Sequence, residues 1–260
     1  MNSENQPLRI LSIGNSFADD QEAYVSPMAL AAGKTILVAN AYIGGCSFRR
    51  HLEEWEEDGR DYHYRENGVT IDKSASLREI LAKRKWDFVT FQSGVEGRSY
   101  VIPIQPYLSR LIRIVRDAQP EAALAYSLTW ADAEDSTRRF FRFAFSGDRE
   151  KQFAHWQKDA AEAKESGIPY LIPVGLAFRR AYSEFGPRLY RDGYHSSELG
   201  RYLHACVWFP FFTGQKVPED FLPAGETYEG GIAPTKEECA RLRFYAAGVL
   251  EETSPTPGKH

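Results

Sequence analysis

The stretch "LRILSIGNSFADD", Leu8 to Asp20, decides the fold of this 260-residue chain. Its branched apolar residues are typical of a buried strand, which ends at Gly14 before an acidic segment that begins a helix. One interpretation of this junction is structural: Gly14 supplies a permissive φ and Ser16 caps the helix. The other is that Ser16 is a nucleophile held at the mouth of a parallel sheet. The remainder of the chain favours one of the two.

The composition is that of a globular protein with one hydrophobic core. Hydrophobic residues make up 43% of the chain and charged residues 26%. A formal net charge of -4 gives no electrostatic reason to expect nucleic acid or an anionic membrane as a partner. No apolar run approaches the roughly 18 residues of a membrane span, and "MNSENQPLRI" lacks the pattern of a secretory signal. We expect a cytoplasmic protein, or a secreted or periplasmic one if a signal peptide has been removed.

The cysteines and the C-terminal segment bound the domain organisation. Three widely spaced cysteines form neither a disulfide framework nor a metal-binding CxxC pattern, so we expect Cys206 in the core and Cys46 and Cys239 as free thiols. We predict one domain over residues 1–252. Residues 253–260, which are rich in Pro, Gly and Ser, are expected to form a flexible tail.

Short apolar runs alternate with helical patterns along the chain, which is typical of a sheet covered on both faces. We predict a single-domain α/β protein with three layers, α/β/α, around a flavodoxin-like parallel sheet of about five strands. Strands are expected at residues 9–13, 35–42, 86–91, 122–128 and 170–173. Helices are expected at residues 21–32, 76–84, 105–118, 149–166, 197–212 and 236–251.

Residues 131–147 are too long for an ordinary strand-to-helix connection. They carry four phenylalanines among charged residues. The segment is either a lid that faces substrate or a segment whose rings pack against the body of the domain. We favour packing.

Polar residues follow each predicted strand, where ligands bind in a parallel sheet of this kind. Each residue alone has a structural explanation, such as a turn or a satisfied core histidine. Together they offer a nucleophile, a base, a carboxylate that orients the base and donors for an oxyanion, which are the needs of acyl transfer. These residues are Ser16, the Gly44-Gly45 pair, Gln92, Trp130, Asp192 and His195.

The blocks "IGNSF", "GG" after the second strand, "DFVTFQSG" and "DGYHSS" resemble the SGNH (GDSL-like) hydrolase superfamily. The resemblance extends from about Leu8 to Gly214 and is closest to a bacterial branch known mainly from sequence. It implies that Ser16 is the nucleophile, His195 the base and Asp192 the carboxylate that orients the base.

The same resemblance implies that the backbone N–H groups of Ser16 and Gly45 are oxyanion donors. The sequence departs from the superfamily at two positions. Asn15 stands where Asp is usual, and we expect this to change only a local hydrogen bond. Gln92 stands where Asn is usual and would supply the third oxyanion donor on a longer arm.

These features predict a serine ester hydrolase that forms an acyl-serine intermediate and needs no metal or other cofactor. A serine hydroxyl needs a base, and an imidazole with an ordinary pKa near 6.5 suits that task. Asp192 and His195 could instead ligate a metal, but no HExxH or comparable ligand cluster accompanies them. The sequence therefore favours nucleophilic catalysis over metal catalysis.

The residues expected around the site are polar and aromatic, which favours removal of acetyl or another small acyl group from a carbohydrate. Trp130, Arg98 and Arg49 are the candidate substrate-binding residues. Hydrolysis of a lipid or another small ester is the alternative activity. A noncatalytic carbohydrate-binding protein on the same fold is the alternative of another class. The expected partner is a small-molecule or oligosaccharide ester, and the oligomeric state stays open.

Overall fold

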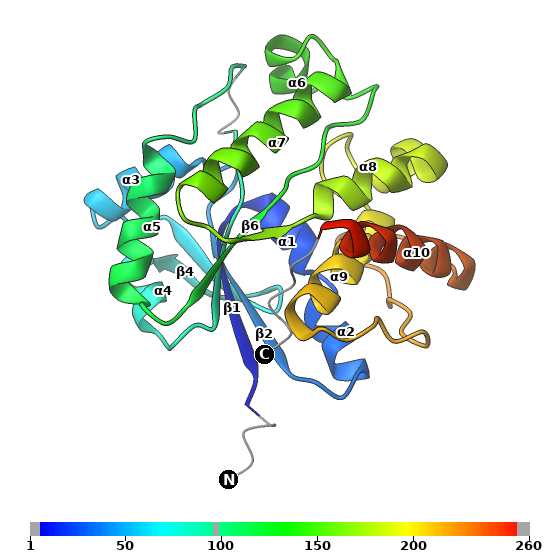
Figure 1. Ribbon diagram of the computed structural model, residues 1–260, viewed down its shortest axis with the longest axis horizontal. Coiled ribbons are helices and arrows are strands. Elements are labelled where there is room, and N and C mark those ends of the chain that lie inside the picture. The colour runs from blue at the N-terminus through cyan, green and yellow to red at the C-terminus, as the bar shows by residue number, and fades with distance from the viewer. Residues whose placement is uncertain (1–5, 96–98, 254–260) are drawn as a thin grey trace.

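A single mixed sheet forms the middle layer of the computed structural model, which describes residues 6–95 and 99–253 (Figure 1). Its strands are β1 (Leu8–Gly14), β2 (Ile36–Tyr42), β3 (Tyr62–Glu66), β4 (Val69–Ala75), β5 (Phe88–Phe91), β6 (Ala123–Ser127) and β7 (Tyr170–Ile172). The seven strands of this sheet, all within the described residues, lie in the order β4-β3-β2-β1-β5-β6-β7. The strands from β2 to β7 in this order are parallel, while β3 and β4 are antiparallel.

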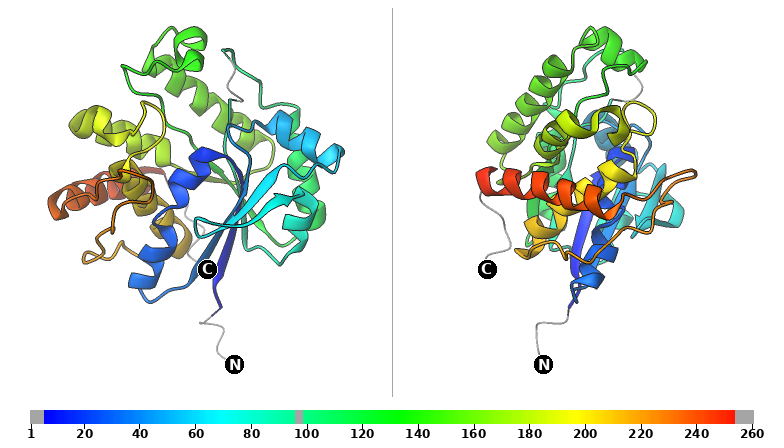
Figure 2. Two further views of the ribbon diagram at one scale, coloured as in Figure 1. Left: turned by 180° about the vertical axis from the view of Figure 1, so that it is seen from behind. Right: turned by 90° about the vertical axis from the view of Figure 1, so that its right-hand side faces the viewer.

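Helices cover both faces of the sheet (Figures 1 and 2). The helices are α1 (Ser16–Glu22), α2 (Val25–Ala31), α3 (Phe48–Glu56), α4 (Leu77–Ala82), α5 (Tyr107–Ala118), α6 (Arg139–Ala144), α7 (Arg149–Glu165), α8 (Val174–Phe185), the 3₁₀ helix η2 (Gly186–Leu189), α9 (Glu198–Thr213) and α10 (Lys236–Thr253). One hydrophobic core contains side chains of α3, α4, α5 and α7. The other contains side chains of α1, α2, α8, α9 and α10. The predicted three-layer α/β/α fold is confirmed.

Strand β1 shows why the sheet is buried on both faces. Leu11 and Ile13 pack into one core and Ile10 into the other, and all three are fully buried. Burial of each such side chain contributes roughly 1.5–3 kcal/mol. Because neither face of the strand meets water, its sequence is a nearly continuous apolar run. The central position of β1 places Ser16, which follows it, over the middle of the sheet.

The five predicted parallel strands are all present. The sheet has two further strands, β3 and β4, which were not predicted. Parallel strands β2-β1-β5-β6-β7 have the flavodoxin-like order. The missed hairpin has polar, partly exposed sequences, YHYRE and VTIDKSA, so it lacks an apolar run. Its turn, Asn67-Gly68, has positive φ at both residues and is a hairpin signal that could have found it.

The helix predictions need three corrections. The helix expected at residues 21–32 is two helices, of which α1 begins at Ser16. No helix was predicted for α3 or α8, and none for α6 within residues 131–147. In residues 131–147 three phenylalanine rings are buried while Phe143 is 69% exposed, so packing against the body is confirmed for three of the four.

All three cysteines are buried thiols. Residues 254–260 of the expected tail lie outside the described residues.

None of the helices in the described part of the chain combines the length and the apolar character that crossing a membrane requires.

Candidate active site

Ser16 is the first residue of α1, at the carboxyl end of β1. Gly14 does not have a left-handed φ, but a Cβ at this position would lie 2.6 Å from Cβ of Ala18. The glycine is therefore required for space and not for φ. The helix is capped by Asn15, whose Oδ1 accepts a hydrogen bond from the Phe17 N–H at 2.9 Å. Both parts of the structural interpretation of this junction are thus wrong, and the Ser16 hydroxyl is left for another partner.

Ser16, His195 and Asp192 form a continuous chain of hydrogen bonds. Ser16 Oγ lies 2.8 Å from Nε2 of His195, and Nδ1 of His195 lies 2.6 Å from Oδ2 of Asp192. Because a carboxylate only accepts hydrogen bonds, Nδ1 carries the imidazole proton and Nε2 accepts from the serine hydroxyl. The structure thus brings together the three residues that the sequence analysis selected.

The loop of residues 191–196 holds Asp192 in its ionised form. Burial alone would raise the pKa of Asp192, but hydrogen bonds from the His195 side chain and from the backbone N–H groups of His195 and Tyr194 lower it below its ordinary value of 3.8. The aromatic rings of Tyr194 and Phe17 flank the imidazole, with centroid separations of 4.2 and 5.8 Å. An ionised carboxylate on Nδ1 fixes the tautomer and stabilises an imidazolium.

On the other side of Ser16, the segments that follow β2 and β5 converge on Asn15. Asn15 Nδ2 donates to the carbonyl oxygen of Cys46 at 3.0 Å, and Asn15 Oδ1 accepts from Gln92 Nε2 at 3.2 Å. A Cβ at Gly94 would lie 1.8 Å from that same carbonyl oxygen, so the two segments pack backbone to backbone. An aspartate at position 15 could not donate to Cys46. The hydrogen bond that depends on an asparagine at this position joins two segments that lie 31 residues apart in the chain.

Three groups on this side are the predicted oxyanion donors. The backbone N–H groups of Ser16 and Gly45 have no acceptor within the described part of the chain, so both are available to a ligand oxygen. Gln92 is only 2% exposed, and one proton of its carboxamide is given to Asn15. The contact shows that Gln92 positions Asn15, and its role as an oxyanion donor stays a prediction.

A buried ionic cluster, which the sequence analysis missed, ties α1 to the loop of residues 191–196. The Asp20 carboxylate is fully buried and accepts from the guanidinium groups of Arg191 and Arg201, each at 2.7 Å. It also accepts from the backbone N–H of Ser196 at 2.8 Å. Asp20 lies one helical turn after Ser16 in α1. This spacing is the only sequence signal that could have pointed to the cluster. The cluster fixes the base relative to the nucleophile.

The candidate substrate-binding residues lie in different environments. Trp130 is 2% exposed, packs against Phe17 and Phe178, and donates from Nε1 to the carbonyl oxygen of Tyr194 at 2.8 Å. Its ring therefore supports the loop that carries the base and has no face open to a ligand. Arg49 lies in the first turn of α3, partly exposed, with Nε 3.6 Å from Glu53. Arg98 lies outside the described residues.

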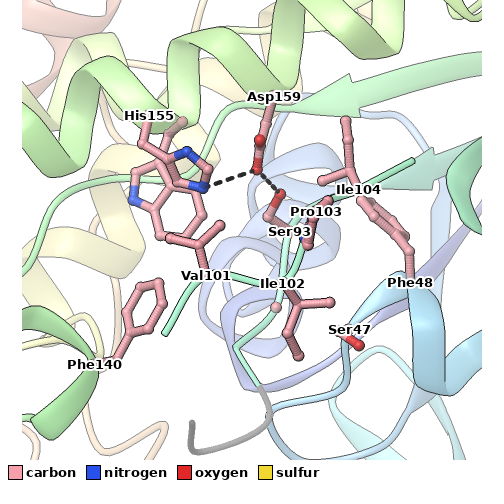
Figure 3. A pocket seen from close by; sticks show the side chains of 12 residues that line it. Ser47, Phe48, Ser93, Val101, Ile102, Pro103, Ile104, Phe140, His155 and Asp159 are labelled. Carbon is pink, nitrogen blue, oxygen red and sulfur yellow. Dashed lines mark hydrogen bonds and ion pairs between the residues drawn. The ribbon is translucent and has the colours of Figure 1, made fainter. Parts of the chain in front are cut away.

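A small cavity lies beside Gly94, between α3 and α7 (Figure 3). Ser93 Oγ donates to Asp159 Oδ2 at 2.7 Å there, and His155 Nε2 lies 3.7 Å from the same oxygen. Burial raises the pKa of Asp159 to about 7 and lowers that of His155 to about 4. The cavity of about 10 Å³ has room for about one water molecule. The hydrogen bond from Ser93 to Asp159 therefore holds the segment after β5 against α7, and the cavity is too small for a substrate.

The comparisons with known proteins agree with this fold. The family model described as "Domain of unknown function (DUF4886)" matches residues 9–228. A crystal structure of a DUF4886 family protein from Bacteroides uniformis has a TM-score of 0.78 and 27% identity, covering 97% of this chain and 98% of that chain. None of the curated proteins compared with the chain matches it.

Two solved structures outside that family share the fold at low identity. One is a protein assigned as a GDSL-like lipase from Parabacteroides merdae, with a TM-score of 0.53 and 16% identity over 78% of this chain and 94% of that chain. The other is a variant of Axe2, an acetyl xylan esterase from Geobacillus stearothermophilus, with a TM-score of 0.52 and 17% identity over the same shares of the two chains. These similarities show that the chain shares the fold of proteins named as a GDSL-like lipase and an acetyl xylan esterase.

Proposed function

The chain belongs to the DUF4886 family, whose function is unknown, and we propose that it is a serine ester hydrolase that works through an acyl-serine intermediate. The observation that carries the proposal is the hydrogen-bonded chain from Ser16 through His195 to Asp192 at the carboxyl end of the central strand. A binding protein has no need of a base aligned on a serine hydroxyl. Acyl transfer requires this alignment.

In the first half of the reaction, Nε2 of His195 takes the proton of Ser16 as Oγ attacks the ester carbonyl carbon. Asp192 stabilises the imidazolium that forms. The N–H groups of Ser16 and Gly45 donate to the oxyanion. The imidazolium then gives its proton to the departing alcohol, which leaves an acyl group on Ser16.

In the second half, His195 takes a proton from a water molecule that attacks the acyl-serine carbonyl carbon. A second oxyanion forms in the same place. Its collapse breaks the bond to Oγ, and the proton on Nε2 returns to Ser16. The products are the carboxylic acid and the regenerated enzyme, with no cofactor consumed.

We place the substrate among carbohydrates that carry acetyl or other small acyl groups. An enzyme that shares the fold and is named an acetyl xylan esterase supports this class. Of the residues predicted from sequence to bind the sugar, Arg49 is partly exposed, whereas Trp130 is buried. Hydrolysis of a lipid or another small ester would use the same residues. The length of the acyl chain distinguishes these substrates, because a lipid ester needs an apolar channel and an acetyl ester does not.

Turnover of p-nitrophenyl acetate together with labelling of Ser16 by a fluorophosphonate tests the proposal. We expect both with the wild-type protein and neither with Ser16→Ala. Activity should survive a chelator, because the described residues contain no group of three His, Cys, Asp or Glu side chains that could hold a metal ion. A folded wild-type protein that is neither active nor labelled would support the carbohydrate-binding alternative instead.

Acyl-chain length and the sugar are determined by two further measurements. Acetyl esters should be hydrolysed faster than octanoyl esters, and the reverse preference would favour a lipid substrate. A screen of acetylated oligosaccharides, read by mass spectrometry as loss of acetate, then identifies the sugar.

A further inference from the structure

A guanidinium group lies on the side of the site that carries the base. Arg138 immediately precedes α6, in the segment at the top of the molecule in Figure 1. Its guanidinium carbon lies 4.2 Å from the ring centroid of Tyr194 and 5.5 Å from that of Phe17. These are the two rings that flank the imidazole of His195. Arg138 thus lies next to the aromatic wall of the site.

The Arg138 guanidinium has more N–H donors than there are acceptors around it among the described residues. The Arg138 side chain is 15% exposed, and within the described part of the chain it donates only to Asp132 Oδ1, at 3.4 Å. The surrounding rings attract a cation but accept no strong hydrogen bonds, so most of the five guanidinium N–H groups have no acceptor. A partly desolvated cation with spare donors is a site for an oxygen anion.

The Asp132 carboxylate accepts hydrogen bonds from other groups besides Arg138. This carboxyl is buried and shares its oxygens with Gln152, which donates at 2.8 Å, and with Ser136. Burial raises the pKa of Asp132 even though Arg138 lowers it. Because other donors also occupy the Asp132 oxygens, the Arg138 guanidinium retains N–H groups that can bind a second carboxylate.

In the proposed mechanism, the region around Arg138 and Tyr194 lies where the alcohol part of the ester would bind. The imidazole gives its proton to the departing alcohol oxygen, so that oxygen must lie beside Nε2 of His195. The carbonyl oxygen instead faces the donors at Ser16 and Gly45. Arg138 and Tyr194 lie on the His195 side and are placed to contact what the alcohol oxygen carries.

We propose that Arg138 and Tyr194 form the subsite for the alcohol part of the ester and select an alcohol that bears a carboxylate. The inference rests on the proposed function. The guanidinium binds the carboxylate, and the edge of the Tyr194 ring packs against the body of the alcohol. The Tyr194 hydroxyl, which has no partner among the described residues, is free to bind a further polar group.

Two acetyl esters that differ in one group test the proposal: 4-acetoxybenzoate and its methyl ester. We expect the wild type to prefer the carboxylate. Arg138→Gln should lower kcat/KM for 4-acetoxybenzoate by about 10- to 100-fold, mostly through KM, and change the methyl ester by less than about threefold. Arg138→Lys should retain part of the preference because it keeps the charge without the planar fork.

The matched control is Arg139→Gln, which removes an exposed guanidinium from the adjacent position and should leave both substrates unchanged. A third ester, mono-4-nitrophenyl succinate, carries its carboxylate on the acyl side and should not depend on Arg138. Melting temperatures show that the variants are folded.

Equal losses on both acetoxybenzoates with a folded Arg138→Gln protein would overturn the proposal, because Arg138 would then only position the loop of His195. A dependence on Arg138 for the succinate and not for 4-acetoxybenzoate would also overturn it. Failure of the proposed function has a different signature: the wild type hydrolyses none of the esters and Ser16 is not labelled.

Discussion

The contacts on the His195 side of Ser16 are ionic, whereas those on the oxyanion side join neutral groups. On the first side the fully buried Asp20 carboxylate binds Arg201, which is buried, and Arg191, which is partly exposed. On the second side the Asn15 and Gln92 carboxamides bind each other, and Asn15 binds a backbone carbonyl. Both sets of contacts hold loops against the start of the same short helix.

The difference matches the charge that each side would meet in the proposed reaction. The imidazole of His195 becomes positive, and the carboxylate of Asp192 stabilises that charge. The carbonyl oxygen becomes negative on the other side, where a carboxylate would repel it and a carboxamide can donate to it. The exchange of Asp for Asn at position 15 removes a negative charge from the side where the oxyanion forms.

Substitution of the nucleophile Ser16 or the base His195 should have the largest effect on activity. Ser16→Ala and His195→Ala should each lower kcat by about 10⁴- to 10⁶-fold, because nucleophile and base act as one unit. The double variant should be little worse than either single variant. Steady-state kinetics with p-nitrophenyl acetate measures this, and losses that multiply would contradict the assignment.

Breaking the ionic side should lower stability most. Asp20→Asn leaves the buried guanidinium of Arg201 and the partly exposed one of Arg191 without their carboxylate, so we expect the free energy of unfolding to fall by about 3–5 kcal/mol. Urea unfolding measures the change. The control Asp117→Asn, on the exposed surface of α5, should stay within about 0.5 kcal/mol of the wild type. A near-wild-type Asp20→Asn protein would show that the cluster is not needed to hold the loop.

Breaking the neutral side should lower activity more than stability. If Gln92 donates to the oxyanion, Gln92→Ala lowers kcat by roughly 10²- to 10³-fold, about 2.7–4 kcal/mol, with KM within a few-fold. Gln92→Glu should be at least as harmful, because its carboxylate repels the oxyanion. If Gln92 only holds Asn15, melting temperature falls and kcat per folded molecule is nearly unchanged. Near-wild-type kcat in Gln92→Glu rules out the oxyanion role.

Exchanging Asn15 for the residue usual in the superfamily sharpens the comparison further. Asn15→Asp removes the donor to the Cys46 carbonyl oxygen and faces that oxygen with a carboxylate. We expect a loss of about 1–3 kcal/mol in the free energy of unfolding and a lower kcat. Asn15→Ser keeps a capping oxygen without the charge and is the matched control. An Asn15→Asp protein as stable and active as the wild type would mean that the Cys46 contact is dispensable.

The smallest effect is the pH dependence of the rate, which should arise only from the His195 side of Ser16. Only a neutral imidazole accepts the serine proton, so the rate should rise with pH between pH 5 and 9. Because the pKa of Asp192 is held below 3.8, its carboxylate stays ionised throughout that range and adds no second step. Its contribution to stability is present above pH 3.8 and is lost as pH falls through its lowered pKa.

The Gln92→Ala variant should keep the midpoint of the wild-type pH profile, since a carboxamide does not titrate. Asp192→Asn should change the profile, because it removes the charge that holds the imidazole tautomer. The pH dependence of kcat/KM for the three proteins measures this. A flat wild-type profile from pH 5 to 9, with chemistry rate-limiting, would contradict the role of His195.

The parts of the fold with a strong local signal were predictable. The five parallel strands are short apolar runs, and their ends were predicted to within two residues. Strands β3 and β4 were missed because neither is an apolar run. Strand β3 alternates buried tyrosines with half-buried polar residues, and β4 is mostly half-buried or exposed. The start of α1 was missed because the helix was expected only from residue 21, although Asn15, a residue type strongly preferred at helix N-caps, directly precedes Ser16.

The sequence by itself determined which strands form the parallel sheet and which polar residues follow them. In such a sheet the carboxyl ends of the strands share one edge, so residues as distant as Ser16 and His195 can be assigned to one rim. Only the tertiary structure decided which of them touch. The bonds that organise the site span 77 residues from Asn15 to Gln92 and 181 from Asp20 to Arg201, and local patterns carry no information about such pairs. For the same reason Trp130 seemed a candidate for substrate, although packing buries it, while Arg138 drew no attention.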